Sequence, residues 1–353
     1  MRIWIINHYA ITPDMPGGTR HYHFAWQLIN RGHDVTIVAA NYNHFSQTFN
    51  TLPNQNASID YSHAVPFIWI PVPAYKGNTI ARFWNMLVFS SRLLRNKYLP
   101  CSLKPDVIIG SSPHLFSAFA ALLLSKRIKK PFILEIRDVW PDTLVELGRF
   151  SKNHPLIKMM KLIERYLYRN AKCIITLLPL VKNYLVQSGV KSQTISWIPN
   201  AIDNKALPSL ENKKTPSPFT VMYAGSHGLA NNLQVVLQAA KLIQAQGMGD
   251  RIRICLVGEG PEKITLKKLA EAEDLRIVEF MDPVSKKDIY PLLNEADAFL
   301  MLLKHAPVFR YGISPNKLFD YLLMARPVIF GVDTTYNPIE KANAGITIAA
   351  NDP

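Results

Sequence analysis

The stretch YGISPNKLFDYLLMARPVI, residues 311 to 329, places several polar and turn-forming residues directly before an apolar run. If the run from Leu318 forms a helix, Ser314 or Asn316 is expected to cap it. The first backbone N–H groups of a helix have no partner within it, and the helix dipole is positive at that end, so this position suits an anion. The alternative is a well-capped surface helix without a ligand, and this stretch alone leaves both readings open.

Two further glycine-containing turns are candidates for similar chemistry. In YAGSHGLANN, Gly225 and Gly228 permit a close approach of the backbone to a ligand, so this turn could hold a phosphate. The stretch VGEGPEK begins like a dinucleotide-binding fingerprint, but Lys263 stands where GxGxxG requires its third glycine. This mismatch disfavours a Rossmann-type oxidoreductase.

The apolar runs of the first half predict a parallel sheet that would position these turns. Residues 2–6 read as a strand, a helix follows from about Thr19, and residues 34–40 read as the next strand, which makes a βαβ unit. Similar strands are predicted at 106–112, 131–138 and 172–178. Helix-length segments separate them, which is typical of a parallel sheet covered on both faces.

The same pattern starts again in the second half. After the polar stretch SLENKKTPSPF comes a new first strand and then an amphipathic helix. The strands predicted here are 219–225, 252–258, 277–281, 298–302 and 327–331. We therefore expect an α/β protein with two Rossmann-like, doubly wound domains, residues 1–203 and 204–353. Ligands bind beyond the carboxyl ends of such strands, so two facing domains should share a cleft.

Composition limits the class of partner. The chain has 353 residues, of which 48% are hydrophobic and 19% charged, as in globular proteins. Its net charge of +14 indicates an anionic partner, namely nucleic acid, anionic lipid or a phosphorylated substrate. The sequence carries no nucleic-acid-binding signature, which makes nucleic acid the weaker choice.

The sequence also predicts where the protein resides. Its opening, MRIWII, lacks the features of a secretory signal, and no apolar stretch approaches the roughly 20 residues that span a bilayer. Cys101, Cys173 and Cys255 have neither disulfide nor metal-ligand spacing. The chain contains no Asp-x-Asp pair and no close His and carboxylate cluster. We expect a cytoplasmic protein that needs no metal and no cofactor.

Several motifs in order resemble one known family. YAGSHG, LVGEGPEK, VEFMDPVSKKDIYPLLNEADAFLMLL and SPNKLFDYLLMARPVI resemble the C-terminal half of family 4 glycosyltransferases, which have the two-domain GT-B fold. In the first half, residues 6–40 and RDVWPD (137–142) are similar to the bacterial O-antigen and capsule branch of this family. That branch includes N-acetylfucosamine transferases. The resemblance covers nearly the whole chain.

The resemblance implies a nucleotide-sugar donor in the C-terminal domain. Its diphosphate would lie at the helix N-terminus formed by residues 314–317, and Asp320 would bind the ribose. Lys317 would neutralise the leaving diphosphate, which makes it a predicted catalytic residue. The other predicted donor-binding residues are Gly225, Ser226, His227, Glu259, Phe280, Tyr311, Gly312, Ile313, Ser314, Pro315 and Asn316.

The chain departs from the family at two donor positions. Many members have a glutamate, here replaced by Gly312, that contacts the donor sugar, so the identity of the sugar cannot be inherited. The basic pair common near the start of the second domain is not evident, and His227 stands there instead. Lys317 is the expected substitute, because a compact ammonium at a helix N-terminus suits a pyrophosphate. The alternative is that Lys317 is a solvated surface lysine.

In the first half the resemblance points to an acceptor side. Gly17 and Gly18 resemble a glycine loop close to the donor phosphate and the acceptor. Arg137 replaces the acceptor-side histidine of the family, and Asp138 follows it as a candidate to orient or deprotonate the acceptor. In the alternative interpretation, Asp138 caps a turn or pairs with Arg137.

Residues 67–98 mix aromatic and basic side chains as a membrane interface does. Trp69, Tyr75, Phe83, Trp84, Phe89 and Leu93 alternate there with Lys76, Arg82, Arg92, Arg95 and Lys97. They predict peripheral attachment to an anionic membrane, on the inner face of the cytoplasmic membrane. A helix packed in the core with a basic outer face would have the same composition, so both interpretations stay open.

The leading hypothesis is a retaining, metal-independent glycosyltransferase. It would move a sugar from a nucleotide donor, namely a UDP-sugar such as UDP-N-acetyl-L-fucosamine, to a polyprenyl-diphosphate-linked saccharide in surface polysaccharide synthesis. A nucleotide-sugar epimerase of the same fold and a non-catalytic binding subunit are the alternatives. Family members continue into a helix that crosses back to the first domain, so a shortened chain is expected.

Overall fold

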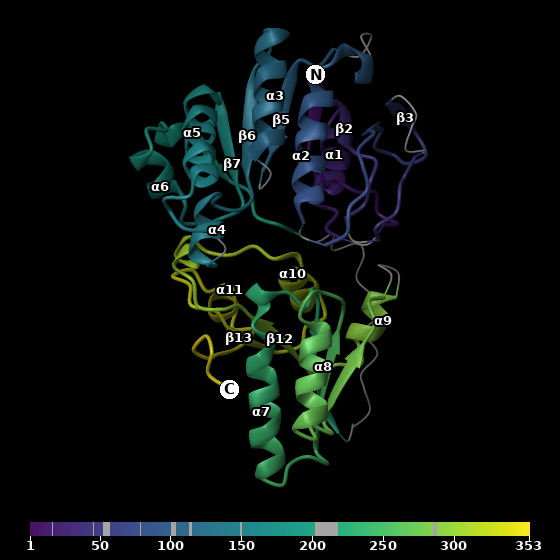
Figure 1. Cartoon of the computed structure of the whole chain (residues 1–353), viewed down its shortest axis with the longest axis vertical. Helices are drawn as coiled ribbons and strands as arrows, with labels where there is room; N and C mark the ends of the chain where they lie inside the picture. The colour runs from purple at the N-terminus through teal and green to yellow at the C-terminus, as the bar shows by residue number, and fades with distance from the viewer. Residues whose placement is uncertain are drawn as a thin grey trace. The chain divides into compact units, whose positions relative to one another are not determined.

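The computed structural model divides the chain into two compact units, residues 1–199 and 200–353. It describes residues 1–15, 17–44, 46–51, 57–77, 79–99, 104–112, 115–148, 150–201, 218–284 and 288–353. The domain boundary expected between residues 203 and 204 lies outside the described residues. Each unit is an α/β layer structure built on its own sheet, as the sequence predicts (Figure 1).

The N-terminal unit is built on an eight-stranded sheet in the order β3-β4-β2-β1-β5-β6-β7-β8. All neighbouring strands are parallel except the β3–β4 pair. The strands are β1 (Arg2–Ile6), β2 (Asp34–Ala40), β3 (Ser58–Asp60), β4 (Phe67–Ile70), β5 (Val107–Ser111), β6 (Phe132–Ile136), β7 (Cys173–Thr176) and β8 (Ile195–Trp197).

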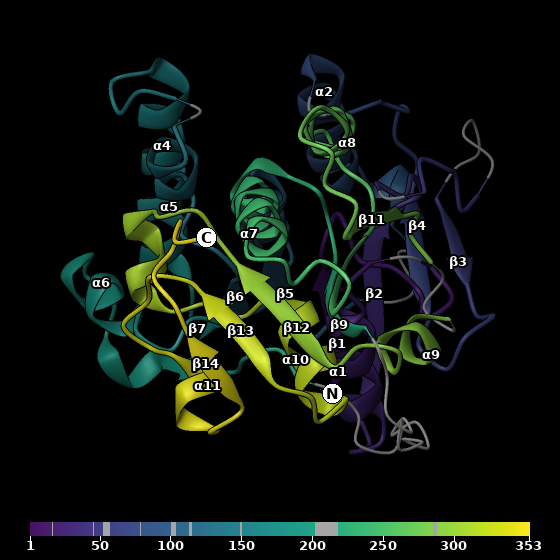
Figure 2. The ribbon, with the colours of Figure 1, turned by 90° about the horizontal axis from the view of Figure 1, so that it is seen from below.

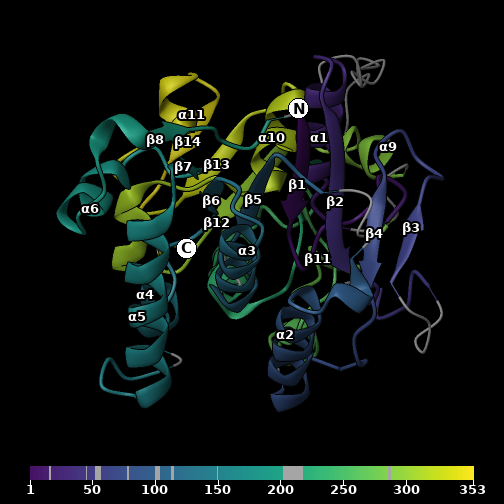
Figure 3. The ribbon, with the colours of Figure 1, turned by 90° about the horizontal axis from the view of Figure 1, so that it is seen from above.

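The helices of this unit cover the sheet on two sides. They are α1 (Arg20–Ile29), α2 (Ile80–Leu93), α3 (Leu115–Arg127), α4 (Asp142–Glu146), α5 (Pro155–Asn170) and α6 (Lys182–Gln187). The chain crosses the sheet in one direction through α1 and in the other through α2, α3 and α5. Because parallel crossovers are right-handed, α2, α3 and α5 form one helical layer and α1 lies on the opposite face (Figure 3).

The C-terminal unit has a six-stranded parallel sheet in the order β11-β10-β9-β12-β13-β14 (Figure 2). The strands are β9 (Phe219–Ala224), β10 (Ile252–Val257), β11 (Val278–Met281), β12 (Ala298–Leu302), β13 (Val328–Gly331) and β14 (Gly345–Thr347). The helices are α7 (Leu233–Ala245), α8 (Lys263–Ala272), α9 (Ile289–Leu293), α10 (Asn316–Leu323) and α11 (Pro338–Lys341). The expected strands of both halves are confirmed within one or two residues.

Four short strands were not expected from the sequence. β3, β8 and β14 have only three residues each, too few to display an alternating pattern. β4, with the sequence FIWI, is buried along its whole length. It pairs with β2 in the interior of the sheet.

This placement corrects part of the membrane prediction for residues 67–98. Trp69, Tyr75, Phe89 and Leu93 are buried core side chains and cannot meet a lipid surface. Ile80 and Trp84 on α2 remain exposed. In the part of the chain that the structure describes, no helix is both long and apolar enough to cross a bilayer.

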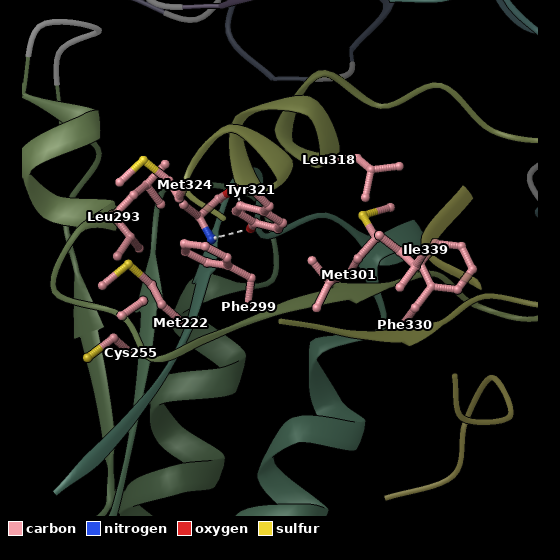
Figure 4. Close-up of a cluster of buried hydrophobic side chains, with 14 of the residues drawn as sticks. Met222, Cys255, Leu293, Phe299, Met301, Leu318, Tyr321, Met324, Phe330 and Ile339 are labelled. Carbon is pink, nitrogen blue, oxygen red and sulfur yellow. Dashed lines mark hydrogen bonds between the residues drawn. The ribbon is translucent and has the colours of Figure 1, made fainter. Parts of the chain in front are cut away.

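One core cluster of the C-terminal unit fixes α10 on its sheet (Figure 4). The ring of Tyr321 stacks on that of Phe299 with their centroids 4.4 Å apart and their planes parallel within 1°. The Tyr321 hydroxyl accepts a hydrogen bond from the Ala224 N–H at 2.8 Å and donates to the Ala224 carbonyl at 3.2 Å. Because Ala224 ends β9, this contact places the start of α10 beside the turn that follows β9.

Tyr321→Phe keeps the ring stack but removes both hydrogen bonds to Ala224. It leaves a buried backbone N–H without its partner, so we expect the free energy of unfolding of the C-terminal unit to fall by about 1–3 kcal/mol. Urea denaturation of the whole chain measures this change. Tyr61→Phe, at an exposed ring, is the matched control and should change it little. Equal effects of the two substitutions would contradict the anchoring role.

Candidate functional site

The loops that follow β9 and β10 pack backbone against backbone. The His227 N–H donates to the Glu259 carbonyl at 2.9 Å, and the Glu262 N–H donates to the His227 carbonyl at 3.0 Å. A Cβ on Gly258 would lie 1.9 Å from the Gly225 carbonyl oxygen, and one on Gly260 would lie 2.5 Å from that of His227. The glycines of VGEGP are therefore required by loop packing, which explains a partial fingerprint without a dinucleotide site.

Lys317 reaches from α10 to the turn after β9. Its Nζ donates to the Tyr223 hydroxyl at 2.9 Å and to the Asn231 Oδ1 at 2.8 Å, and it lies 4.2 Å from the centroid of the Tyr223 ring. A Cβ on Gly225 would lie 3.3 Å from the Lys317 Cδ, so the glycine leaves room for this side chain. The structure thus brings two of the predicted motifs together at one lysine.

Among the described residues, the charge of Lys317 has no counter-ion. Its neighbours are neutral oxygens, and no carboxylate of the described residues forms an ion pair with it. Burial lowers the pKa of Lys317 to about 7. An anion placed beside the ammonium would favour the protonated form and reverse this shift.

Tyr223 and Asn231 were not predicted as site residues. Tyr223 belongs to the apolar strand β9 and is fully buried, so its sequence context indicated only core. Its hydroxyl donates to the Ser226 carbonyl at 2.7 Å, and the Asn231 side-chain amide donates to the same carbonyl at 2.9 Å. These bonds orient both side chains toward Lys317.

The predicted cap of α10 is wrong. The helix begins at Asn316 with Pro315 as its N-cap residue, and no side chain of the described residues caps it. The Ser314 hydroxyl instead accepts from the Asn200 backbone N–H at 2.9 Å, and the Ser314 carbonyl accepts from the Asn200 side chain. The Leu318 N–H donates to the Pro315 carbonyl at 3.3 Å, and Asn200 holds the loop before the helix.

Gly312 adopts a backbone conformation with φ +92° and ψ 174°. This region is essentially open to glycine alone. A glutamate at this position would therefore adopt the observed backbone conformation only under strain. Of its neighbours, Ile313 is buried in the core and Tyr311 lies with its ring centroid 4.5 Å from the Arg310 guanidinium.

Asp320 lies one turn after Lys317 on α10. Its Oδ1 accepts from the Tyr290 hydroxyl at 3.1 Å. Residues three apart on a helix share a face, so Lys317 and Asp320 follow one another along one side of α10.

His227 is completely buried between two aromatic rings, at 6.0 Å from Tyr223 and 6.2 Å from Phe280. Neither ring nitrogen has a hydrogen-bond partner of ordinary geometry among the described residues. Burial and then the charge of Lys263 lower the pKa of His227 to about 4, so the ring is neutral at pH 7. A buried neutral imidazole offers one donor and one acceptor to a ligand.

Glu259 is an exposed side chain on the β10–α8 loop, 3.4 Å from the Lys263 Nζ. Lys263 also donates to Asp282 at 2.7 Å and to the Met281 carbonyl at 3.2 Å. Burial opposes the charge of Lys263, but the hydrogen bond to Asp282 and the charge of Glu259 outweigh it and raise its pKa. This lysine closes the loop where a third glycine was expected.

The predicted residues of the N-terminal unit lie at the carboxyl edge of its sheet. Gly17 and Gly18 precede α1, and Gly17 has φ +129°. Arg137 and the exposed Asp138 follow β6, and the Arg137 N–H donates to the Ser112 hydroxyl at 3.1 Å. In the part of the chain that is described, no ion pair joins Asp138 to Arg137.

A buried polar network behind these residues was missed by the sequence reasoning. Glu135, fully buried in β6, accepts from the Arg20 Nε at 2.8 Å, the His21 Nε2 at 2.7 Å and the Ser111 hydroxyl at 2.5 Å. Burial alone would raise the pKa of Glu135, but His21 and then Arg20 hold it well below its usual range. A single glutamate inside the apolar run FILEI was the available signal.

Arg20 continues this network to the end of the unit. Its guanidinium donates to the Pro199 carbonyl at 2.6 Å and to the Ile198 carbonyl at 2.8 Å. The start of α1, the end of β6 and the last residues of the unit are therefore held by one buried side chain. Burial lowers the pKa of His21, and the neighbouring Glu135 carboxylate opposes this effect.

Comparison with known families matches both halves of the chain. Residues 17–201 match the glycosyl transferase 4-like domain, and residues 209–308 match the glycosyl transferases group 1. A curated relative is the putative colanic acid biosynthesis glycosyl transferase WcaI of Escherichia coli K12, which is 27% identical over 238 residues. This match covers 62% of the chain and 55% of the relative, so the chain spans about half the length of that protein.

Two solved structures share the fold over nearly the whole chain. Sucrose-phosphate synthase from Thermosynechococcus elongatus is 14% identical with a TM-score of 0.72, covering 99% of this chain and 86% of that one. HepE from Anabaena, solved with UDP and glucose, is 13% identical with a TM-score of 0.65, covering 100% and 87%. The fold is that of the two-domain GT-B glycosyltransferases.

Lys317→Met tests the electrostatic position of this lysine. The folded protein holds the charge less readily than the unfolded chain does, so we expect the substitution to raise the free energy of unfolding by about 1 kcal/mol. The folded pKa of about 7 lies below the ordinary value near 10.5, so the gain should be full below pH 7 and fade as pH rises toward 10.5. Urea unfolding across this pH range measures it.

Lys268→Met, at an exposed position of α8, is the matched control and should leave stability unchanged at every pH. If Lys317→Met instead lowers the stability at pH 7, Lys317 stabilises the fold, and the expectation that its buried charge costs stability is wrong.

Proposed function

The chain belongs to the glycosyl transferase 4-like family, and from this we propose that it transfers a sugar from a nucleoside diphosphate to an acceptor. The observation that carries the proposal is Lys317. Its ammonium has no counter-ion in the described part of the chain and lies at the N-terminus of α10, beside two glycine turns whose backbones approach closely. A diphosphate supplies the charge that this position lacks.

We propose that the donor lies along the carboxyl edge of the C-terminal sheet. Its diphosphate would meet Lys317 and the first N–H groups of α10, with Gly225, Ser226, Gly312, Ser314, Pro315 and Asn316 forming the surrounding backbone. The Asp320 carboxylate would accept hydrogen bonds from both ribose hydroxyls. The uracil of a UDP-sugar would lie near His227, Glu259 and Phe280. The solved complex of HepE with UDP is consistent with this donor class.

The chemistry would not require a divalent ion in this proposal. As the bond between the sugar and the diphosphate breaks, negative charge grows on the phosphate oxygens, and Lys317 with the α10 dipole would stabilise it. Departure and attack on the same face of the sugar would retain the anomeric configuration. Asp138 would orient or deprotonate the acceptor hydroxyl, and Gly17, Gly18 and Arg137 would line the acceptor side.

We propose a lipid-linked saccharide as the acceptor, on the inner face of the cytoplasmic membrane. The relative from Escherichia coli is named for colanic acid biosynthesis, which supports a role in a surface polysaccharide. UDP-N-acetyl-L-fucosamine is the donor suggested by the motifs of the first half. The glycine at 312 means that groups other than a glutamate would read the sugar hydroxyls.

Lys317→Ala tests the proposed reaction. We expect the native protein to transfer label from one of a panel of UDP-, GDP- and dTDP-sugars to a bacterial lipid extract. Removing a group aimed at the developing charge should lower turnover by about a hundredfold. Retained turnover in the variant would remove Lys317 from the mechanism. Epimerised donor without labelled lipid would point to an epimerase instead.

The affinity for UDP should depend on pH through Lys317. Since its pKa in the unliganded protein is about 7, binding above that pH requires uptake of a proton, so UDP affinity should fall as pH rises from 7 to 9. Lys317→Arg stays charged throughout this range and should lose the dependence. Calorimetric titration with UDP measures both proteins, and parallel pH profiles would contradict the assignment.

Asp320→Asn tests the ribose position. The substitution keeps the shape but replaces a charged acceptor, so we expect the dissociation constant of UDP to rise about tenfold, in line with a lost charge-assisted hydrogen bond. Binding of inorganic pyrophosphate, which has no ribose, should be unchanged and serves as the control. If both ligands weaken equally, Asp320 acts on α10 and not on the ribose.

A further inference from the structure

We propose that the outer face of the α2–α3–α5 layer docks the protein on an anionic lipid membrane. The surface is defined by the exposed or half-exposed side chains Ile80, Trp84, Phe116, Phe119, Leu123, Met159, Leu162 and Tyr166 and by the basic side chains around them. It keeps the exposed side chains of segment 67–98, namely Ile80, Trp84, Arg95 and Lys97, and leaves out the buried aromatic residues of that segment. The proposal concerns where the proposed transferase would meet its membrane, but lipid binding itself needs neither donor nor acceptor.

The three helices form one continuous layer on one face of the sheet, with α3 between α2 and α5 (Figures 1 and 3). Edge-to-face aromatic pairs join them: Phe83 with Phe116 at 5.5 Å, and Phe119 with Tyr166 at 5.8 Å. α3 itself, LFSAFAALLLSKR, is apolar on nearly all sides before its last turn. Phe116, Phe119 and Leu123 are half-buried, and the other side chains before the last turn are buried.

Large apolar side chains project from this layer. Ile80 is 87% exposed, Trp84 59% and Leu162 65%. On α5, Met159, Leu162 and Tyr166 recur at a spacing of three and four residues, so they form one stripe along the helix. The buried side of α5 is carried by other residues, such as Ile157 and Leu167. The exposed stripe is therefore additional to what the fold requires of this helix.

The charge of the layer is almost entirely positive. Segments 80–99, 115–130 and 155–170 each contain four basic residues, and their only acidic residue is Glu164. Glu164 is buried and hydrogen-bonded to Lys161, Tyr168 and Tyr184, so it does not offset the surface charge. Exposed basic residues of the layer are Arg95, Lys97, Lys126, Arg127, Lys129, Lys130, Lys158, Arg165 and Arg169.

The geometry of α5 shows how the two kinds of side chain are arranged. Lys158, Arg165 and Arg169 are spaced by seven and four residues and form a second stripe beside Met159, Leu162 and Tyr166. Apolar side chains that can enter the acyl boundary, next to cations at the depth of lipid phosphates, are the pattern of interfacial helices. A nucleic acid would use the basic stripe but would leave the exposed isoleucine, leucine and methionine in water.

The test uses the full chain with vesicles of phosphatidylglycerol and phosphatidylcholine, followed by co-sedimentation. We expect binding to the mixed vesicles that weakens with salt, and little binding to pure phosphatidylcholine. The variant Lys158→Gln/Arg165→Gln/Arg169→Gln should lower the partition coefficient about a hundredfold, since each basic residue near an anionic surface is worth about 1 kcal/mol. Leu162→Ser should lower it severalfold without changing the net charge.

The matched control removes the same charge elsewhere. Arg31→Gln/Arg251→Gln/Lys268→Gln changes three exposed basic residues outside the layer and should keep most of the binding. Thermal midpoints of all variants check folding, and the altered side chains are exposed. If the control weakens binding as much as the α5 variant does, net charge alone attracts the protein to the vesicles. That result would overturn the proposed docking surface. Unchanged binding by Leu162→Ser would overturn the insertion of the apolar stripe.

Two further outcomes separate the alternatives. A duplex oligonucleotide that binds the native chain more tightly than vesicles, and displaces them, would make this face a nucleic-acid surface and overturn the lipid assignment. Binding of UDP by the same variants distinguishes the docking surface from the proposed function. If UDP is not bound but vesicle binding still depends on Leu162 and the basic stripe, the proposed function fails and the docking surface stands.

Discussion

The stacked and hydrogen-bonded contact between α10 and the sheet underlies the candidate donor site. Tyr321 lies flat on Phe299 and bonds to both polar atoms of Ala224, at the residue where β9 ends. Lys317 is one turn earlier on the same helix, so this contact sets where its ammonium lies relative to Tyr223 and Asn231. A buried aromatic residue thus determines the position of a charge, because a rigid helix connects them.

The close contact of the two glycine turns is the second constraint. The backbones of residues 225–227 and 258–260 approach so closely that a Cβ on Gly258 or Gly260 would overlap a carbonyl oxygen. In the packed loops, the ring of His227 lies 6.0 Å from that of Tyr223 and 6.2 Å from that of Phe280. Glycines without a functional side chain therefore determine where the polar groups of the site lie.

Much of this arrangement could be predicted from the sequence, for a physical reason. Buried parallel strands such as β2 and β12 are continuous apolar runs, so their positions follow from composition within one or two residues. The cap of α10 could not be predicted, because Ser314 is bound by Asn200, which is 114 residues away in sequence. Glu135 was hidden for the same reason, and so was the contact of Tyr223 and Asn231 with Lys317, which lies 94 and 86 residues away from them. The aromatics of residues 67–98 show the converse error, since composition alone does not distinguish a lipid-facing tryptophan from the buried Trp69.

The backbone at Gly312 also limits how this protein can change. Its φ of +92° with ψ of 174° is a conformation that side chains other than hydrogen rarely allow. A single codon change to glutamate would therefore introduce the carboxylate into a loop that cannot present it, and the variant would lose stability before it gained a sugar contact. The loop between Pro307 and Ser314 would have to be rebuilt first. A glutamate at this position is thus more than one mutational step away from the present chain.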